Sequence, residues 1–247
     1  MELLHLTTPS PGRLVLGRTQ HELLWTVGRT CQLLREDLLA FCVVDEHVHL
    51  VVRTTDRPRL LQRWRTGLSR RLDLGPTHIQ PVQSRTHLRN LESYMLLQPR
   101  KHGLREHPSL YQGSCAGEIL GWRVNPFFDS ARIQTELPRS RPDAWARIGL
   151  VEPELGNATE LAARGPDELT RLAKECLHLV PHAKGRVRAL VGSLCGGHRR
   201  VAEALGLSLR GLRNARAREV PTGDVRALGM RVAIDGALMR NAGLRTG

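Results

Sequence analysis

Aromatic residues are scarce in this chain, and it has no long apolar run. Phe, Trp and Tyr make up 4% of the 247 residues, and two of them are tyrosines, Tyr94 and Tyr111. Stacking of bases on a wide aromatic platform is therefore not expected. No apolar stretch approaches the length of a membrane helix, and the first residues, with Glu2 and few basic side chains, do not resemble a signal peptide. The composition predicts no membrane partner.

Paired cysteines are also missing, and acidic residues are outnumbered. The five cysteines are scattered without a C-x-x-C pair, which is typical of reduced thiols in a cytoplasm. Lys and Arg number 37 against 24 Asp and Glu, which gives a net charge of +13 and a pI of about 10.9. This excess favours nucleic acid over an acidic membrane surface as the partner. It predicts a cytoplasmic, nucleoid-associated protein whose backbone charge contacts dominate binding.

Residues 41–52 form an apolar stretch that two acids and two histidines interrupt. Val and Phe enrichment predicts strand, and the break at residues 45–46 predicts a hairpin over 38–53. Alternate side chains of a strand share a face, so His47 and His49 are expected to project together, as half of a divalent-metal site. Most histidines near apolar strands bind no metal. Zinc is an alternative, but no paired cysteines lie nearby to complete a usual structural site.

Residues 88–99 form a second informative stretch. Leu88, Leu91 and Met95 recur at helical spacing and predict a buried stripe. Tyr94 and Gln98 are four residues apart and share a helix face, and Pro99 is expected to end or kink the helix and leave Gln98 near a mobile end. An amide oxygen suits Mg²⁺ or Mn²⁺, and a phenol one turn away can attack what the cation polarises. The alternative is an ordinary amphipathic helix.

Together the two stretches resemble the single-tyrosine HUH transposases, and within them the REP-associated tyrosine transposases. Residues 46–52 read E-H-V-H-L-V-V, and residues 94–104 read Y-M-L-L-Q-P-R-K-H-G-L. The family pattern is His-hydrophobic-His on a strand, then a helix with Tyr and, four residues on, Asn or Gln before Pro. Residues 106–114 resemble the segment that closes the catalytic domain, so the resemblance covers residues 1–120. Two departures are the Asp45-Glu46 pair in place of Pro-Asn and Gln98 where Asn is more frequent.

The resemblance implies a fold, a metal site and a reaction. The fold is α+β, with a ferredoxin-like domain whose antiparallel sheet carries helices on one face, followed by a small all-α helix-turn-helix domain. His47, His49 and Gln98 would hold one Mg²⁺ or Mn²⁺, and Tyr94 would attack the scissile phosphate. The implied products are a 5′-phosphotyrosine enzyme and a free 3′-OH, and the implied substrate is single-stranded DNA with a hairpin. The protein would act as a monomer or a homodimer.

The sequence pattern predicts the same β-α-β-β-α-β order. Strands are expected at 3–8 and 77–83, on either side of the hairpin, with helices at 19–35 and 57–72. The second helix is rich in arginine: Arg59, Arg63, Arg65, Arg70 and Arg71. Such a face is either simply solvated or a surface for the DNA backbone, and we favour the latter. The predicted DNA-binding set also includes Arg100 and Lys101.

The rest of the chain changes in charge. Residues 126–183 carry seven basic and nine acidic residues with six prolines, which indicates a linker with short helices at 143–149, 158–163 and 167–178. The expected domains are therefore a nuclease at 1–122, a linker region at 123–183 and a basic DNA-binding domain at 184–247. From Lys184 onward, the chain has thirteen basic residues and four acidic residues.

Residues 201–213 match a helix-turn-helix. Ala202 is small where two helices cross, Gly206 permits the turn, and Ser208 can cap the second helix. Duplex DNA is a further expected partner through this module, with these predicted contacts: Arg199, Arg200, Arg210, Arg213 and Arg216. The alternative is a plain helical hairpin on a basic surface.

Two other functions compete with the transposase-like one. The first is a domesticated DNA-binding regulator in which the helix-turn-helix works and the nuclease domain is vestigial. The second is a plasmid relaxase or rolling-circle initiator, although those enzymes usually carry a third metal-binding histidine and often a second catalytic tyrosine.

Overall fold

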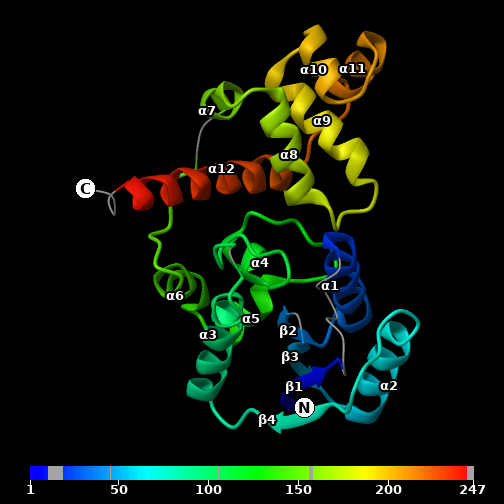
Figure 1. Ribbon diagram of the computed structural model, residues 1–247, viewed down its shortest axis with the longest axis vertical. Coiled ribbons are helices and arrows are strands. Elements are labelled where there is room, and N and C mark those ends of the chain that lie inside the picture. The colour runs from blue at the N-terminus through cyan, green and yellow to red at the C-terminus, as the bar shows by residue number, and fades with distance from the viewer. Residues whose placement is uncertain (11–18, 45, 105, 156–157, 244–247) are drawn as a thin grey trace. The chain divides into compact units, whose positions relative to one another are not determined.

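The computed structural model describes residues 1–10, 19–44, 46–104, 106–155 and 158–243 (Figure 1). Asp45, at the expected turn of the hairpin, lies outside this set. The chain forms two compact units, Met1–Ile119 with Pro126–Gly149, and Leu120–Asn125 with Leu150–Gly247. These boundaries differ from the ranges expected from composition: residues 126–149 go with the first unit and 150–183 with the second. Among the described helices, none is long and apolar enough to span a bilayer.

The first unit is built on an antiparallel sheet of strand order β2-β3-β1-β4, four strands within the described residues. Its elements are β1 (Glu2–Pro9), α1 (Gln20–Leu34), β2 (Leu38–Val43), β3 (His47–Thr54), α2 (Arg57–Leu68) and β4 (His78–Pro81). Strand β3 lies between β1 and β2, which is the ferredoxin-like arrangement of two split β-α-β halves. The predicted α+β class is therefore confirmed. Helix α2 ends four residues earlier than expected, and β4 is three residues shorter.

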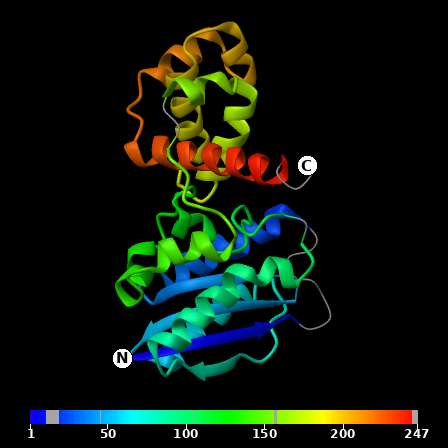
Figure 2. The same ribbon diagram turned by 90° about the vertical axis from the view of Figure 1, so that its left-hand side faces the viewer.

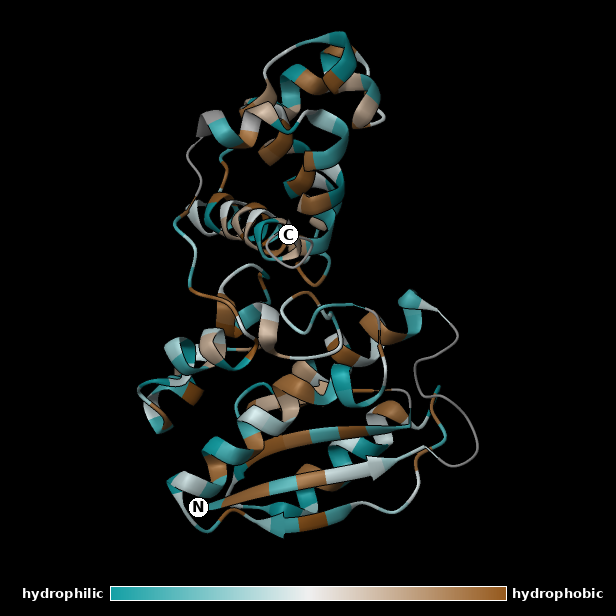
Figure 3. Ribbon diagram, turned by 60° about the vertical axis from the view of Figure 1, so that its left-hand side comes forward, coloured by the Kyte–Doolittle hydropathy of each residue, from teal (hydrophilic) through white to brown (hydrophobic). Residues whose placement is uncertain are grey.

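The two faces of this sheet differ in chemistry. In the strand register Leu6, Leu50 and Phe41 stand opposite one another, all buried, and form the apolar face. One residue along, Thr7, His49 and Cys42 stand opposite one another on the other face. The alternation of brown and teal along the strands shows this pattern (Figure 3). Helices α1 and α2 lie on one side of the sheet, as predicted, and helix α3 (Arg85–Lys101) lies on the other (Figures 1 and 2).

Helix α3 corrects the expectation about Pro99. The helix begins after its N-cap Ser84 and continues through Pro99 to Lys101. A proline in the last turn removes one backbone hydrogen bond. Beyond the helix the chain is held by the Leu104 N–H, which donates to the Pro99 carbonyl at 2.9 Å. Gln98 is 1% exposed rather than close to a mobile end.

A buried ion pair fixes α3 to helix α6 (Ser140–Arg147). Glu92 on α3 is 1% exposed, and its carboxylate accepts hydrogen bonds from the Arg147 guanidinium at 2.8 Å and from the Ser140 hydroxyl. Burial raises the pKa of the Glu92 carboxyl, and both partners counteract that rise. Removal of one member of such a pair leaves an uncompensated buried charge, which is more costly than removal of both.

We expect Arg147→Ala to lower the free energy of unfolding by about 3 kcal/mol, because Glu92 then stays buried without its cation. Urea denaturation followed by circular dichroism measures this loss. The control is Arg89→Ala, since Arg89 is exposed and only 3.9 Å from Asp143, and its loss should be under about 0.5 kcal/mol. Equal losses in the two variants would show that the Glu92 pair does not stabilise the unit.

The region expected to be a linker with short helices contains the helices predicted at 158–163 and 167–178, and the one predicted at 143–149 begins three residues earlier. Its elements are α5 (Ser130–Glu136), α6, α7 (Ala158–Ala163) and α8 (Pro166–Leu177), preceded by α4 (Ala116–Leu120). The prolines and acids that suggested a linker have structural positions. Pro166 occupies the first turn of α8, where a backbone N–H has no partner within the helix, so its absence in proline costs nothing. Glu175 pairs with Arg231 at 2.9 Å. Composition could not distinguish these uses from a solvated linker.

The second unit continues with α9 (Ala183–Cys195), α10 (Arg199–Ala204), α11 (Leu209–Arg216) and α12 (Thr222–Gly243). Helices α10 and α11 enclose the turn predicted for the helix-turn-helix. Gly206 has φ +60°, a conformation that glycine adopts without strain, and the Ser208 hydroxyl accepts from the Gly211 N–H at 3.1 Å. The helical C-terminal part is thus confirmed, and it begins before Lys184, because α8 packs on α9 and α12.

Candidate active site

Strand β3 and helix α3 bring the predicted residues together in the first unit. The rings of His47 and His49 lie 4.4 Å apart between centroids and at 87° to each other, on the sheet face that α3 covers. The ring of Tyr94 lies 5.2 Å from that of His49, also edge to face. The period of two along the strand thus places both imidazoles beside the tyrosine, as the sequence predicted.

Gln98 lies between these contacts along α3. Tyr94, Gln98 and His102 follow one another at intervals of four residues, so their side chains share one helix face. Tyr94 contacts His49, and the His102 ring lies 5.1 Å from that of His47. Among the described residues, neither the Gln98 amide nitrogen nor His49 Nε2, both buried, has a hydrogen-bond partner. An amide can be turned to present its oxygen instead of its nitrogen, so Gln98 could act as a metal ligand.

His49 has the surroundings of a metal-binding imidazole. Its Nδ1 lies 3.2 Å from His5 Nε2 and 3.2 Å from the Thr7 hydroxyl, which orients the ring from behind. Burial lowers the pKa of His49 to about 3, helped by repulsion from neighbours that include His47, His5, His102 and Lys101. The ring is therefore neutral at pH 7, which is the form that ligates a metal.

The donor set fits one hard or borderline divalent cation. Within the described part of the chain, no group of three or more His, Cys, Asp and Glu side chains is placed to hold a metal. A site here would therefore consist of His47, His49 and the amide of Gln98, with further positions left to substrate oxygens. The roles of these three residues as ligands stay predictions.

Sequence reasoning missed two histidines that contact the predicted ligands, and two more, His78 and His87, that line the pocket beside them. His5 stacks on His49 with ring centroids 5.4 Å apart, and His102 contacts His47. The signal for His102 was its spacing of four from Gln98. His5 belongs to a strand whose register with β3 could not be read from the sequence.

A pocket of about 640 Å³ opens beside this cluster. Besides Tyr94, its lining includes five histidines: His5, His47, His49, His78 and His87. Burial lowers the pKa of His5 and, together with repulsion from His102, that of His47. Lys101, an exposed predicted DNA contact, places its ammonium group 4.0 Å from the centroid of the Tyr94 ring. A cation over a phenol ring holds the ring in place electrostatically.

The second tyrosine is used differently. Tyr111 is 5% exposed, and its hydroxyl donates to the Val43 carbonyl at 2.6 Å. It is a structural residue beside β2, whereas Tyr94 lines the pocket.

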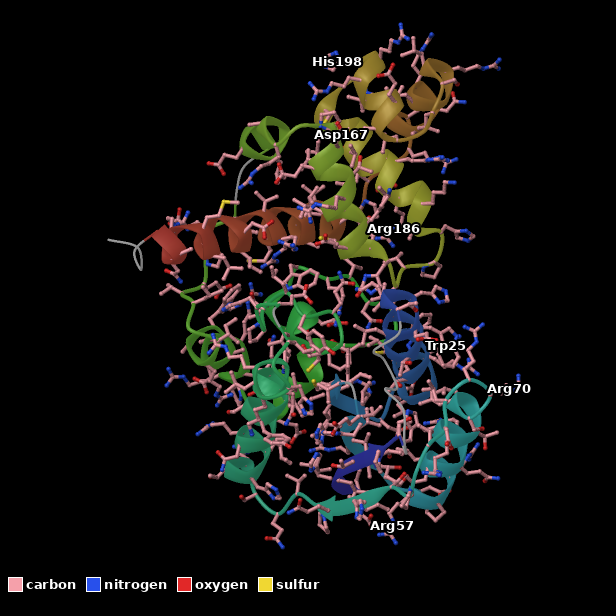
Figure 4. All side chains as sticks on the ribbon, viewed as in Figure 1. Trp25, Arg57, Arg70, Asp167, Arg186 and His198 are labelled. Carbon is pink, nitrogen blue, oxygen red and sulfur yellow. The ribbon has the colours of Figure 1, made fainter. Side chains whose placement is uncertain are left out.

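The arginines of α2 and of the segment after it divide into exposed and engaged residues. Arg59 and Arg70 are exposed (Figure 4 labels Arg70), while Arg63 pairs with Asp37 at 2.6 Å. Arg71 lies over the Trp25 ring at 4.8 Å. Arg65 is committed to the fold, because it donates to the carbonyls of residues 74 and 75 and to Thr77.

The other predicted DNA contacts lie at the surface. Arg100 is exposed, with a long hydrogen bond of 3.5 Å to the Ile148 carbonyl. In the second unit Arg199 pairs with Glu203 at 2.9 Å. The remaining arginines are exposed on α10 and α11: Arg200, Arg210, Arg213 and Arg216.

Comparison with known proteins adds one solved structure. No family model and no curated protein matches the chain. The chain is similar to the REP-associated tyrosine transposase in the structure of that protein bound to a REP hairpin, with 17% identity and a TM-score of 0.38. The match covers 51% of this chain and 83% of that one.

Proposed function

We propose that the chain is a metal-dependent single-stranded DNA endonuclease and strand transferase of the single-tyrosine HUH type, acting at DNA hairpins. One observation carries this proposal: Tyr94 lies against His49 at the edge of a histidine-lined pocket, one turn from the buried amide of Gln98. A nucleophile, two neutral imidazoles and an amide one helical turn away are the groups that phosphoryl transfer to a tyrosine requires.

The chemistry follows from these groups. A Mg²⁺ or Mn²⁺ held by His47, His49 and Gln98 would supply electrophilic polarisation of the scissile phosphate. The Tyr94 oxygen forms a bond to phosphorus while the bond from phosphorus to the 3′ oxygen breaks. The phenol proton is released to solvent, and the leaving oxygen takes up a proton to become the free 3′-OH. Attack by a 3′-OH on the 5′-phosphotyrosine reverses these steps and rejoins DNA without an external energy source.

DNA binding in this proposal is mainly electrostatic. The net charge of +13 and the exposed arginines on α2, α10 and α11 favour the phosphate backbone. Single-stranded or hairpin DNA would enter the histidine-lined pocket, and α11 would present its arginines to duplex DNA.

We expect replacement of Arg210, Arg213 and Arg216 by glutamine to weaken duplex binding and to reduce the slope of log K against log salt by about 2 to 3. Fluorescence anisotropy at several salt concentrations measures this slope. A deletion from Lys184 is a poorer test, because it would separate α9 from α8 inside one packed unit. The control is the same triple replacement at Arg141, Arg164 and Arg171, which lie outside the predicted DNA contacts; an equal change of slope there would argue against α11 as the binding helix.

A covalent-adduct assay tests the proposal as a whole. The intact protein, mixed with hairpin oligonucleotides and Mn²⁺, should form a covalent complex that survives electrophoresis under denaturing conditions. If the protein binds the hairpin but forms no adduct with any of them, the DNA-binding regulator becomes the better description.

A further inference from the structure

A second cavity, of about 360 Å³, lies within the helical unit. It is bounded by one face of α8, the first two turns of α9 and the end of α10. Val187 and Leu205 are buried and supply apolar walls. Its size is at the lower end of the range for small-molecule sites. It is separate from the histidine-lined pocket, and none of its residues has a part in the proposed reaction.

The cavity has a concentration of uncompensated positive charge. Lys174, Lys184 and Arg188 line it, and none of them forms an ion pair with another described residue. Lys184 and Arg188 are one turn apart on α9, where like charges repel. Other arginines of the unit are paired, including Arg186 with Asp224 and Arg231 with Glu175. No Asp or Glu lines the cavity.

His178 borders the cavity but adds no charge to it. Its Nδ1 lies 2.8 Å from the Glu175 carbonyl, and because a carbonyl can only accept, Nδ1 carries the proton. Burial and the nearby Arg123 lower the pKa of His178 to about 4, so the ring is neutral at pH 7. Nε2 is buried, so a molecule in the cavity does not reach it, and the polar binding groups of the cavity are the three cations.

We propose that this cavity binds a small amphipathic acid. Its carboxylate would be held by the three cations, and its apolar body would contact Val187 and Leu205. A DNA phosphate is the competing occupant for the cations. It has no apolar body for the buried walls, so the small acid fits the cavity better.

Isothermal titration of the full-length protein with three related probes tests the proposal. We expect saturable one-to-one binding of 4-hydroxybenzoate, similar binding of 4-methoxybenzoate, which keeps the carboxylate and the apolar ring, and no binding of 4-hydroxybenzylamine, which reverses the charge. Equal affinity for the three probes, or absence of saturable 4-hydroxybenzoate binding, would overturn the proposal.

Variants locate the site. Lys184→Glu with Arg188→Glu should weaken 4-hydroxybenzoate binding by tenfold or more, and Ala204→Trp should block it by filling the cavity while every cation remains. The matched double variant Arg213→Glu with Arg226→Glu changes the net charge equally at exposed positions outside the cavity and should keep the affinity. Circular dichroism checks that each variant is folded. If the control loses as much affinity, or if Ala204→Trp binds normally, the acid is not bound in this cavity.

Discussion

Tyr94→Phe is expected to bind hairpin DNA with unchanged affinity and to form no denaturant-stable adduct. The substitution removes one oxygen, while the ring keeps its edge-to-face contact with His49 and its position under Lys101. A phenol is a weak nucleophile unless it is activated, so cleavage depends on this oxygen being placed beside an activated phosphate. Loss of a nucleophile typically lowers the rate by on the order of 10⁴-fold or more. Denaturing electrophoresis of labelled oligonucleotides measures it.

Tyr111→Phe is the matched control, because the chain has only these two tyrosines. Its hydroxyl donates to the Val43 carbonyl, so the variant should unfold about 1 kcal/mol more easily and yet form the adduct at the normal rate. Each variant thus has a distinct signature, lost chemistry in one and lost stability in the other. An adduct that persists in Tyr94→Phe and disappears in Tyr111→Phe would reverse the assignment of the nucleophile.

The sequence predicted those parts of the site that depend on local periodicity. A period of two placed His47 and His49 on one face, and a spacing of four placed Tyr94 above Gln98. Both relations hold whatever the rest of the chain does. The order of strands and helices was also readable, because apolar runs and polar turns alternate along the first hundred residues.

Long-range pairing was not readable. His5 stacks on His49 only because β1 lies beside β3 in a particular register, and a shift by one residue would place it on the other face. The burial of Gln98 likewise depends on how the chain closes after Pro99. In residues 126–183 the short helices were readable, but composition did not show that charges there are engaged in pairs, such as Arg147 with Glu92.

His49→Ala is expected to weaken Mn²⁺ binding by at least about 100-fold. Loss of an outer partner of a metal ligand typically costs about 10- to 100-fold in affinity, and loss of the ligand itself should cost no less. Isothermal titration with Mn²⁺ measures the affinity. Gln98→Ala should weaken it less, because a neutral amide is a weaker donor than imidazole for manganese. His21→Ala removes an exposed histidine of α1 and should leave the affinity unchanged.

His5→Phe distinguishes a metal site from a packed histidine cluster. The phenyl ring preserves the stacking on His49. It removes the Nε2 atom of His5, which lies 3.2 Å from the Nδ1 atom of His49. If His49 binds Mn²⁺ through Nε2, the loss of this orienting partner should weaken binding about tenfold, while the thermal unfolding temperature changes little. In a purely structural cluster no variant would alter Mn²⁺ affinity, and His49→Ala would only lower the unfolding temperature. Unchanged Mn²⁺ affinity in both His5→Phe and His49→Ala would therefore remove the metal from the proposed mechanism and leave Tyr94 without its activator.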